Sequence, residues 1–234
     1  MTALFRTIEG EIARERVELD AWLSESYAGI EAPRYYGEWD ASYEGWGRIE
    51  SLVGRVFDQA LSQRLNQASV ESVLFFISRS NEIGRIIAWL SEGPPFSWCG
   101  NLSHPDFLFL SEQALVRPDD DCDYQLASCY RKCESLGDRE IDVLQRFFQK
   151  RDSYTRRRVL HVFEHFGLPQ VVDLATTLWQ TDDDEFAKLS CLHALKTVPD
   201  ARHIFDAYIR EYKNTFDIDA EEYRQTHMRK LTAT

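Results

Sequence analysis

Apolar residues recur at every third or fourth position along almost the whole chain, and this spacing restricts the fold more than any other feature. Residues at i, i+3, i+4 and i+7 share one face of an α-helix, whereas a half-buried strand needs strict alternation. Stretches in which Val, Ile or Thr alternate with polar residues are rare, and the hairpin dipeptides Asn-Gly and Asp-Gly do not occur. We therefore predict an all-α fold.

Two amphipathic helices are expected in the N-terminal part. Their stripes are Leu4, Ile8, Ile12, Leu19, Trp22 and Leu23, and then Tyr43, Trp46, Ile49, Val53, Val56, Phe57 and Leu61. Residues 29–40 between them are read as a loop because of Pro33 and Gly37. Shorter helices follow near 70–78 and 82–90, with Ser69 and Asn81 as expected N-caps. Residues 93–105, which contain three prolines, are read as a second loop.

From residue 119 the expected helices become regular and paired. The first of them reaches Leu136 and is ended by Gly137. The others are expected over 138–150, 154–166, 170–180, 185–197 and 201–213, and a last helix begins at Asp219. A shift of 30 places Leu168-Pro169 on Val198-Pro199 and, in the preceding helices, Val159 on Leu189. A shift of 31 places Leu144 on Ala175 and Phe147 on Leu178. Three helix–turn–helix units are therefore predicted over about 119–150, 152–181 and 183–214.

These units resemble HEAT-type α-solenoid repeats over about the last 100 residues. The resemblance implies stacked antiparallel helix pairs, because one helical hairpin cannot bury its apolar stripe alone. We expect a single α-helical domain over 1–234. It would consist of a less regular N-terminal helical cap over 1–68, an irregular helical segment over 69–118, the three repeats over 119–214 and a C-terminal capping helix over 215–234.

Charge and cysteine content narrow the expected partners and compartment. The chain carries 27 Lys and Arg against 39 Asp and Glu, a net charge of −12. This balance favours a basic protein partner and disfavours nucleic acid and anionic membranes, which attract basic proteins. Glu9 and Glu11 interrupt any apolar leader, and five cysteines in a long chain fit reduced thiols, so we expect a cytoplasmic protein. At this length no metal or other cofactor is needed to hold the fold.

An aromatic and acidic segment is the predicted partner-binding site. It comprises Tyr35, Tyr36, Glu38, Trp39 and Asp40, in the loop that precedes the second expected helix. Tyr and Trp provide large contact areas in interfaces, and interleaved carboxylates attract a basic partner. Tyr43 and Trp46, just beyond it, are read as core residues of the helix.

A basic cluster stands out in this acidic chain. Arg146, Lys150, Arg151, Arg156, Arg157 and Arg158 lie within 13 residues that hold a single acid, Asp152. Arg151 and Arg156–Arg158 could form an anion-binding or partner-binding patch. Alternatively, the cluster pairs with the acids at 182–185, which also suit the start of a helix. The cluster also keeps open a HEAT-like nucleic-acid-processing protein, such as a DNA glycosylase that removes alkylated bases.

His161, Glu164 and His165 match the H-x-x-E-H pattern of inverted zinc peptidases. Two histidines at i and i+4 can hold Zn²⁺ on one helix face while the Glu acts as a base, so a zinc-dependent hydrolase is one alternative. The other is structural, with His161 and His165 flanking a buried stripe. Cys122, Cys129 and Cys133 share a helix face without a C-x-x-C and are read as core, as is Cys191, for which a nucleophilic role is the alternative.

No phosphate-binding loop, nucleophile elbow or kinase pattern occurs in the sequence. We therefore expect a non-catalytic protein-binding module. Its concrete form is an acidic, immunity-type inhibitor that neutralises a basic partner such as a bacterial toxin.

Overall fold

The computed structural model describes residues 2–28, 42–58, 62–80, 86, 105–117, 121–150 and 152–216. Within these ranges every regular element is a helix and none is a strand, so the all-α prediction is confirmed. No helix in these ranges has both the length and the apolar composition needed to cross a membrane. The chain divides into two compact units, Met1–Val162 and Phe163–Thr234, and the division falls inside one continuous helix, α9 (Ser153–His165).

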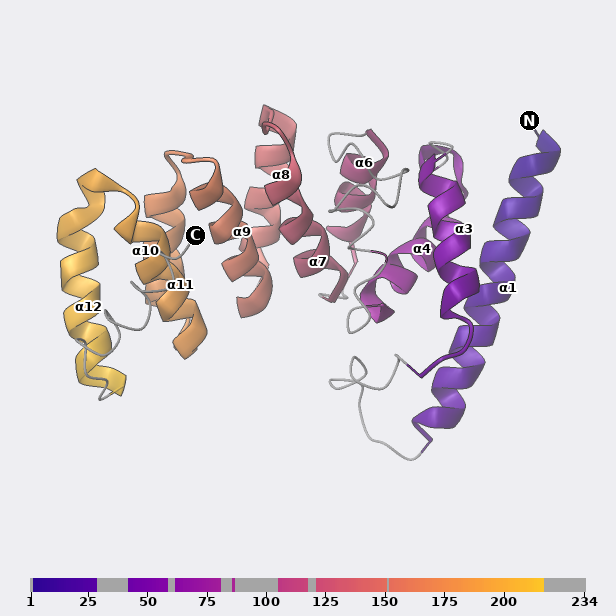
Figure 1. Ribbon diagram of the computed structural model, residues 1–234, viewed down its shortest axis with the longest axis horizontal. Coiled ribbons are helices and arrows are strands. Elements are labelled where there is room, and N and C mark those ends of the chain that lie inside the picture. Colours follow the sequence, from indigo (N-terminus) through magenta and orange to yellow (C-terminus); the bar gives the residue numbers. More distant parts are fainter. Residues whose placement is uncertain are drawn as a thin grey trace. The chain divides into compact units, whose positions relative to one another are not determined.

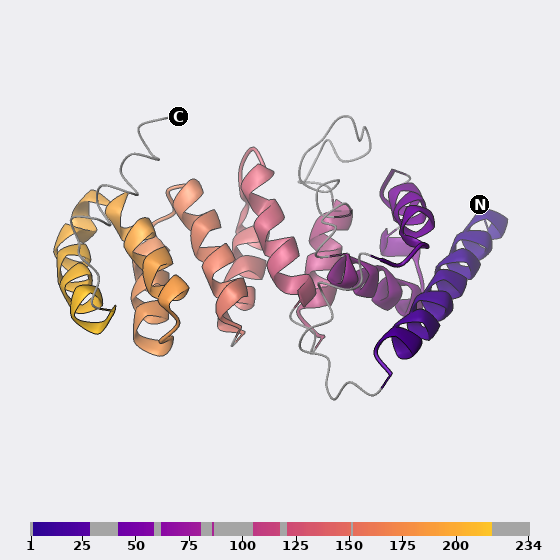
Figure 2. The same ribbon diagram turned by 60° about the horizontal axis from the view of Figure 1, so that its bottom comes forward.

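In the first unit, α1 packs against α3 and α4 (Figures 1 and 2). The described helices of this unit before α9 are α1 (Thr2–Ser26), α3 (Trp46–Asp58), α4 (Gln67–Arg79), α6 (Pro105–Ala114), α7 (Asp121–Cys129) and α8 (Asp138–Gln149), with short 3-10 helices η1 (Ser62–Arg64) and η2 (Tyr130–Lys132). Ile8, Ile12 and Leu19 of the predicted α1 stripe are buried, as are all described members of the second predicted stripe, although Tyr43 of that stripe lies before the start of α3. Periodicity therefore identified the faces that these helices bury.

Ion pairs add to the packing of α1 on α3. Glu15 lies on the buried face of α1, and its carboxylate accepts hydrogen bonds of 3.0 and 3.2 Å from Nε of Arg48. A second nitrogen of Arg48 donates to Glu18 at 2.5 Å, and Arg55 pairs with Glu11. Some of the acids in residues 1–50 therefore form ion pairs with arginines of α3.

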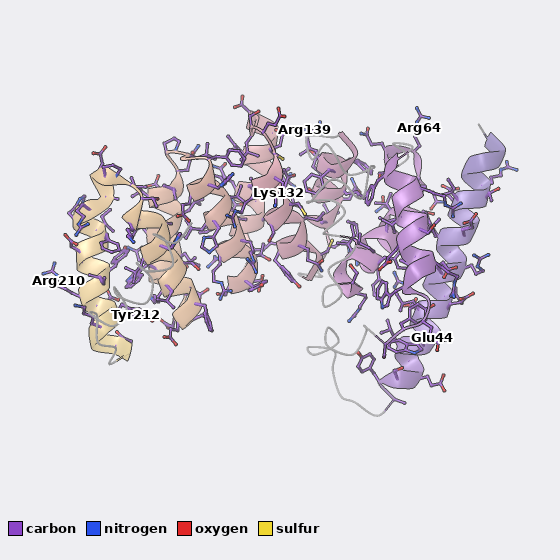
Figure 3. The ribbon with its side chains drawn as sticks, in the orientation of Figure 1. Glu44, Arg64, Lys132, Arg139, Arg210 and Tyr212 are labelled. Atoms are coloured by element: carbon purple, nitrogen blue, oxygen red, sulfur yellow. The ribbon has the colours of Figure 1, made fainter. Side chains whose placement is uncertain are left out.

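A buried polar contact links α6, α7 and α8. Nζ of Lys150, at the end of α8, donates to the carboxylate of Asp123 in α7. It also donates to the carbonyl oxygens of Ala114 (3.3 Å), the last residue of α6, and of Arg117 (3.2 Å), in the turn that follows. The Asp123 side chain has no exposed surface, and that of Lys150 is 17% exposed. Arg139 of α8, labelled in Figure 3, adds a bidentate pair with Glu112 of α6, with both N–O distances at 2.7 Å.

In the second unit, α10 (Val171–Thr181) packs against α11 (Glu185–Lys196), and α11 packs against α12 (Arg202–Phe216), which follows the 3-10 helix η3 (Pro199–Ala201) (Figures 1 and 2). The ring of Trp179 in α10 stacks on that of Tyr208 in α12, with centroids 4.2 Å apart. The hydroxyl of Tyr212, labelled in Figure 3, donates to Glu185 of α11 at 2.9 Å. Aromatic residues of α12 therefore contact both neighbouring helices.

Burial recurs at the predicted period, with one change of register. The shift of 31 between α8 and α10 places three buried residues, Leu144, Phe147 and Phe148, on buried Ala175, Leu178 and Trp179. Between α9 and α11, the shift of 30 places buried Val159 on half-buried Leu189. A shift of 32 instead places Val159, Leu160, Val162 and Phe163 on Cys191, Leu192, Ala194 and Leu195, all of which are buried. The shift of 30 also places buried Val162 on buried Leu192, but the shift of 32 matches more of the buried residues of this helix pair.

Some expected helix ends differ from the structure. Asn66, not Ser69, is the N-cap of α4, and its side chain accepts the Ser69 N–H at 2.9 Å. The helix expected to reach Leu136 ends at Cys129, where the 3-10 turn η2 begins. Gly137 does not end that helix; it precedes α8, and its N–H donates to the Glu140 carboxylate at 3.1 Å. Asn81 lies outside the described residues.

Gly167 ends α9 as predicted, and its backbone is left-handed, with a φ of 61°. Its N–H donates to the Glu164 carbonyl and the N–H of Leu168 donates to the Phe163 carbonyl, both at 3.0 Å. This pair of bonds is the Schellman arrangement, which favours glycine because a Cβ strains left-handed backbone. The chain can therefore turn sharply from α9 towards α10.

We predict that Gly167→Ala lowers the free energy of unfolding by about 1–2 kcal/mol. A Cβ on Gly167 would meet no atom within 4 Å, so the loss comes from backbone strain alone. Gly10→Ala is the matched control, because Gly10 is helical with equally open space and alanine there should stabilise by about 0.5–1 kcal/mol. Urea denaturation measures both. Equal effects of the two substitutions would contradict the assignment of Gly167 as a left-handed cap.

Candidate functional sites

The predicted partner-binding segment lies outside the described residues. Tyr35, Tyr36, Glu38, Trp39 and Asp40 therefore remain a prediction. The two aromatic residues that follow are described. Tyr43 and Trp46 are buried, with ring centroids 6.1 Å apart, and Tyr43 also packs against Trp22 of α1. Their predicted burial is confirmed, but Tyr43 precedes α3 and is not part of the helix as expected.

Several members of the basic cluster have local structural contacts. Nε of Arg156 donates to the carbonyls of Phe148 (3.0 Å) and Lys150 (2.9 Å), at the end of α8. Such bonds satisfy carbonyl groups that a helix end leaves without intrahelical partners. The guanidinium groups of Arg157 and Arg158 lie 4.8 and 4.6 Å from the Tyr154 ring centroid, and Arg158 also donates to the Tyr154 hydroxyl.

The patch of Arg151, Arg156, Arg157 and Arg158 remains a prediction, and Arg151 lies outside the described residues. The expected fit of the acids at 182–185 to a helix start is confirmed. Asp184 is the N-cap of α11, and its side chain accepts the Ala187 N–H at 2.9 Å. Asp182 accepts the Asp184 N–H at 3.0 Å.

All four described cysteines, Cys122, Cys129, Cys133 and Cys191, are buried, as predicted. Burial raises the pKa of Cys191 to about 12 and that of Cys133 to about 11. The thiolate is the nucleophilic form, so at neutral pH these groups are protonated and weakly reactive. The geometry therefore favours core packing over a nucleophilic role for Cys191.

We predict that iodoacetamide alkylates Cys191 about a thousandfold more slowly in the native protein than in urea, at a pH of about 7.5. A thiol pKa raised from the ordinary 9.0 to about 12 lowers the thiolate fraction by that factor, and labelling should accelerate as the pH rises towards 12. Site-resolved mass spectrometry measures the rate. A native rate within about tenfold of the unfolded rate would restore the nucleophilic interpretation.

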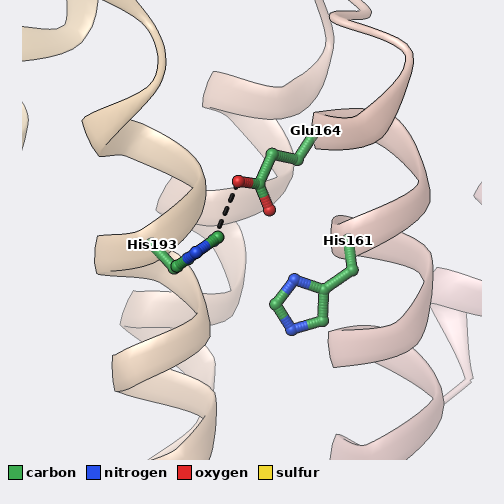
Figure 4. Close-up of side chains that lie close together, drawn as sticks. All are labelled: His161, Glu164 and His193. Carbon is green, nitrogen blue, oxygen red and sulfur yellow. Dashed lines mark ion pairs between the residues drawn. The ribbon is translucent and has the colours of Figure 1, made fainter. Parts of the chain in front are cut away.

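Of the two histidines in the predicted metal site, only His161 lies close to Glu164 and a third possible ligand, His193. Figure 4 shows His161 and Glu164 one turn apart on α9, with His193 of α11 facing Glu164. Nδ1 of His193 lies 2.8 Å from Oε1 of Glu164, and one ligand atom from each of the three side chains lies within 4.8 Å of the others. His165 is exposed, and its ring contacts the neighbouring Phe166.

His193 was not part of the predicted metal site, although a signal for it exists. The register of 32 that matches the buried residues of α9 to those of α11 also places His161 on His193. The shift of 30 hides this equivalence. Comparisons with models of protein families, with curated proteins and with solved structures find no match for this chain.

Proposed function

We propose that this chain is a non-catalytic protein-binding module, built as a HEAT-like α-solenoid of stacked helix pairs, whose partner is a basic protein. The recurrence of burial at shifts of 31 and 32 supports the solenoid. Stacked helix pairs bury one face of each helix and leave extended surfaces that bind other macromolecules. The net charge of −12 favours a basic partner.

One surface at the start of α11 carries this proposal. Phe186 is 62% exposed and follows four consecutive acids, Asp182, Asp183, Asp184 and Glu185. The Asp183 side chain is fully exposed, and its ion pair with Lys188 is long, at 3.8 Å. We call these five residues, 182–186, the Phe186 surface.

The carboxylates of the Phe186 surface keep the capacity to bind a base even though several have local contacts. Asp182 and Asp184 each accept a backbone N–H, and Glu185 accepts the Tyr212 hydroxyl. A carboxylate has about four lone-pair sites, so one such bond leaves others for an incoming Arg or Lys. An exposed aromatic residue that directly follows four acids is suited to the aliphatic stem and charged head of such a side chain.

The Phe186 surface repeats the chemistry of the undescribed segment around Trp39, where aromatic residues also alternate with acids. We propose that both contact the same basic partner. The more specific proposal is that the chain is an immunity-type inhibitor that neutralises a toxin.

The test is a photo-crosslinker, p-benzoylphenylalanine, placed at Phe186 in the source cells. We expect one dominant crosslinked protein with a pI above about 9, because the surface carries excess negative charge. Val17, which is 68% exposed on α1, is the matched position and should not capture that protein. With the purified partner, Phe186→Ala and Asp183→Lys should each weaken binding by about tenfold or more.

Asp142→Lys makes the same charge change on an exposed side chain of α8, and should change the affinity by less than about twofold. Capture of an acidic protein, or an unchanged affinity in both Phe186→Ala and Asp183→Lys, would contradict the Phe186 surface. Alanine at Tyr35, Tyr36 and Trp39 tests the second segment in the same assay, and an unchanged affinity would remove it. If the partner alone does not arrest growth, the toxin proposal fails while the binding proposal stands.

A further inference from the structure

We propose that His161, Glu164 and His193 bind a borderline divalent transition-metal ion, of which Zn²⁺ is the type. This inference is independent of the proposed partner. His161 and Glu164 lie one turn apart on α9, so helix geometry sets their relation, and His193 of α11 reaches Glu164 (Figure 4). The three ligand atoms lie within 4.8 Å of one another.

The donor set and the geometry fit such an ion. Two imidazole nitrogens and one carboxylate oxygen form a combination that Zn²⁺ accepts at bond lengths of about 2.0–2.2 Å. Those bond lengths place ligand atoms of a tetrahedral site about 3.4 Å apart. Glu164 and His193 already approach to 2.8 Å, so the adjustment is a rotation of side chains. The His193 side chain is 45% exposed and that of Glu164 is 12% exposed.

We infer that the Glu164 carboxylate binds the ion directly and does not act as a base on a metal-bound water. This carboxylate is largely buried, and its Oε1 lies 2.8 Å from Nδ1 of His193. A divalent ion bound between these side chains would compensate the charge of the buried carboxylate. This arrangement differs from the inverted zinc-peptidase pattern, in which both histidines come from one helix and the Glu acts on water. Three protein ligands leave a fourth position for water or for a donor from another molecule.

The repeat provides a second, independent reason to group the two histidines. At the register of 32, His161 and His193 occupy equivalent positions of α9 and α11, among equivalent buried residues. His165 falls on Thr197 at the same register, and the exposed His165 ring lies against Phe166. The structure thus selects His193 as the second imidazole in place of the His165 that the sequence pattern selects.

The test is calorimetric titration of untagged, EDTA-treated full-length protein with Zn²⁺, with Co²⁺ absorption as a report of coordination. We expect one equivalent of Zn²⁺ and tetrahedral Co²⁺ bands. His193→Gln should weaken Zn²⁺ binding by more than about 100-fold, since even outer partners of metal ligands are worth 10–100-fold. A glutamine amide at residue 193 can still donate to Glu164, so this variant should keep the fold, which circular dichroism checks.

His165→Gln is the matched control and should bind Zn²⁺ as the wild-type protein does. His161→Gln should behave like His193→Gln. No Zn²⁺ uptake by the wild-type protein at about 100 μM would overturn the site. Wild-type affinity in His193→Gln would also overturn it, and loss in His165→Gln with retention in His193→Gln would return the site to the H-x-x-E-H pattern.

Discussion

A lysine ammonium held among carbonyl oxygens and a buried carboxylate is the contact on which the first unit depends most. The three N–H groups of Lys150 have three acceptors, namely the Asp123 carboxylate and the carbonyls of Ala114 and Arg117. A buried carboxylate without a cation is strongly destabilising, so α7 requires Lys150 in this position. The carbonyl of Lys150 in turn accepts from Arg156, which fixes the start of α9 relative to the end of α8.

Periodicity predicted the helices and their buried faces because apolar burial leaves a regular trace in the sequence. The stripes of α1 and α3, the stop at Gly167 and the 31-residue relation between α8 and α10 all follow from residue type and spacing. Caps were less predictable. Asn66 caps α4 three residues before the expected Ser69, and Gly137 precedes α8 although it was expected to end the helix before it. Each outcome depends on a single contact between one side chain and one backbone N–H.

Charged residues were the least predictable part of the candidate sites. Lys150 and Arg156 read as members of a basic cluster, yet both contact carbonyl oxygens at helix ends, and such long-range pairing has no periodic signature. Glu11, Glu15 and Glu18 similarly contact arginines of α3. The metal site shows the same limit. Spacing within α9 suggested His165, whereas the contact between helices selects His193.

These contacts change how the net charge of −12 is understood. Many charged side chains form ion pairs within the fold. The charged side chains that can contact a partner are the exposed ones, such as Asp183 beside Phe186. The claim that charged side chains build this fold is tested most directly by the free energy of unfolding of Lys150→Met, measured by urea denaturation. It should fall by about 3–5 kcal/mol, and adding Asp123→Leu should restore most of that loss. Lys132→Met, at an exposed residue of the same unit, should change it by less than about 0.5 kcal/mol. Equal, small effects of Lys150→Met and Lys132→Met would contradict the account.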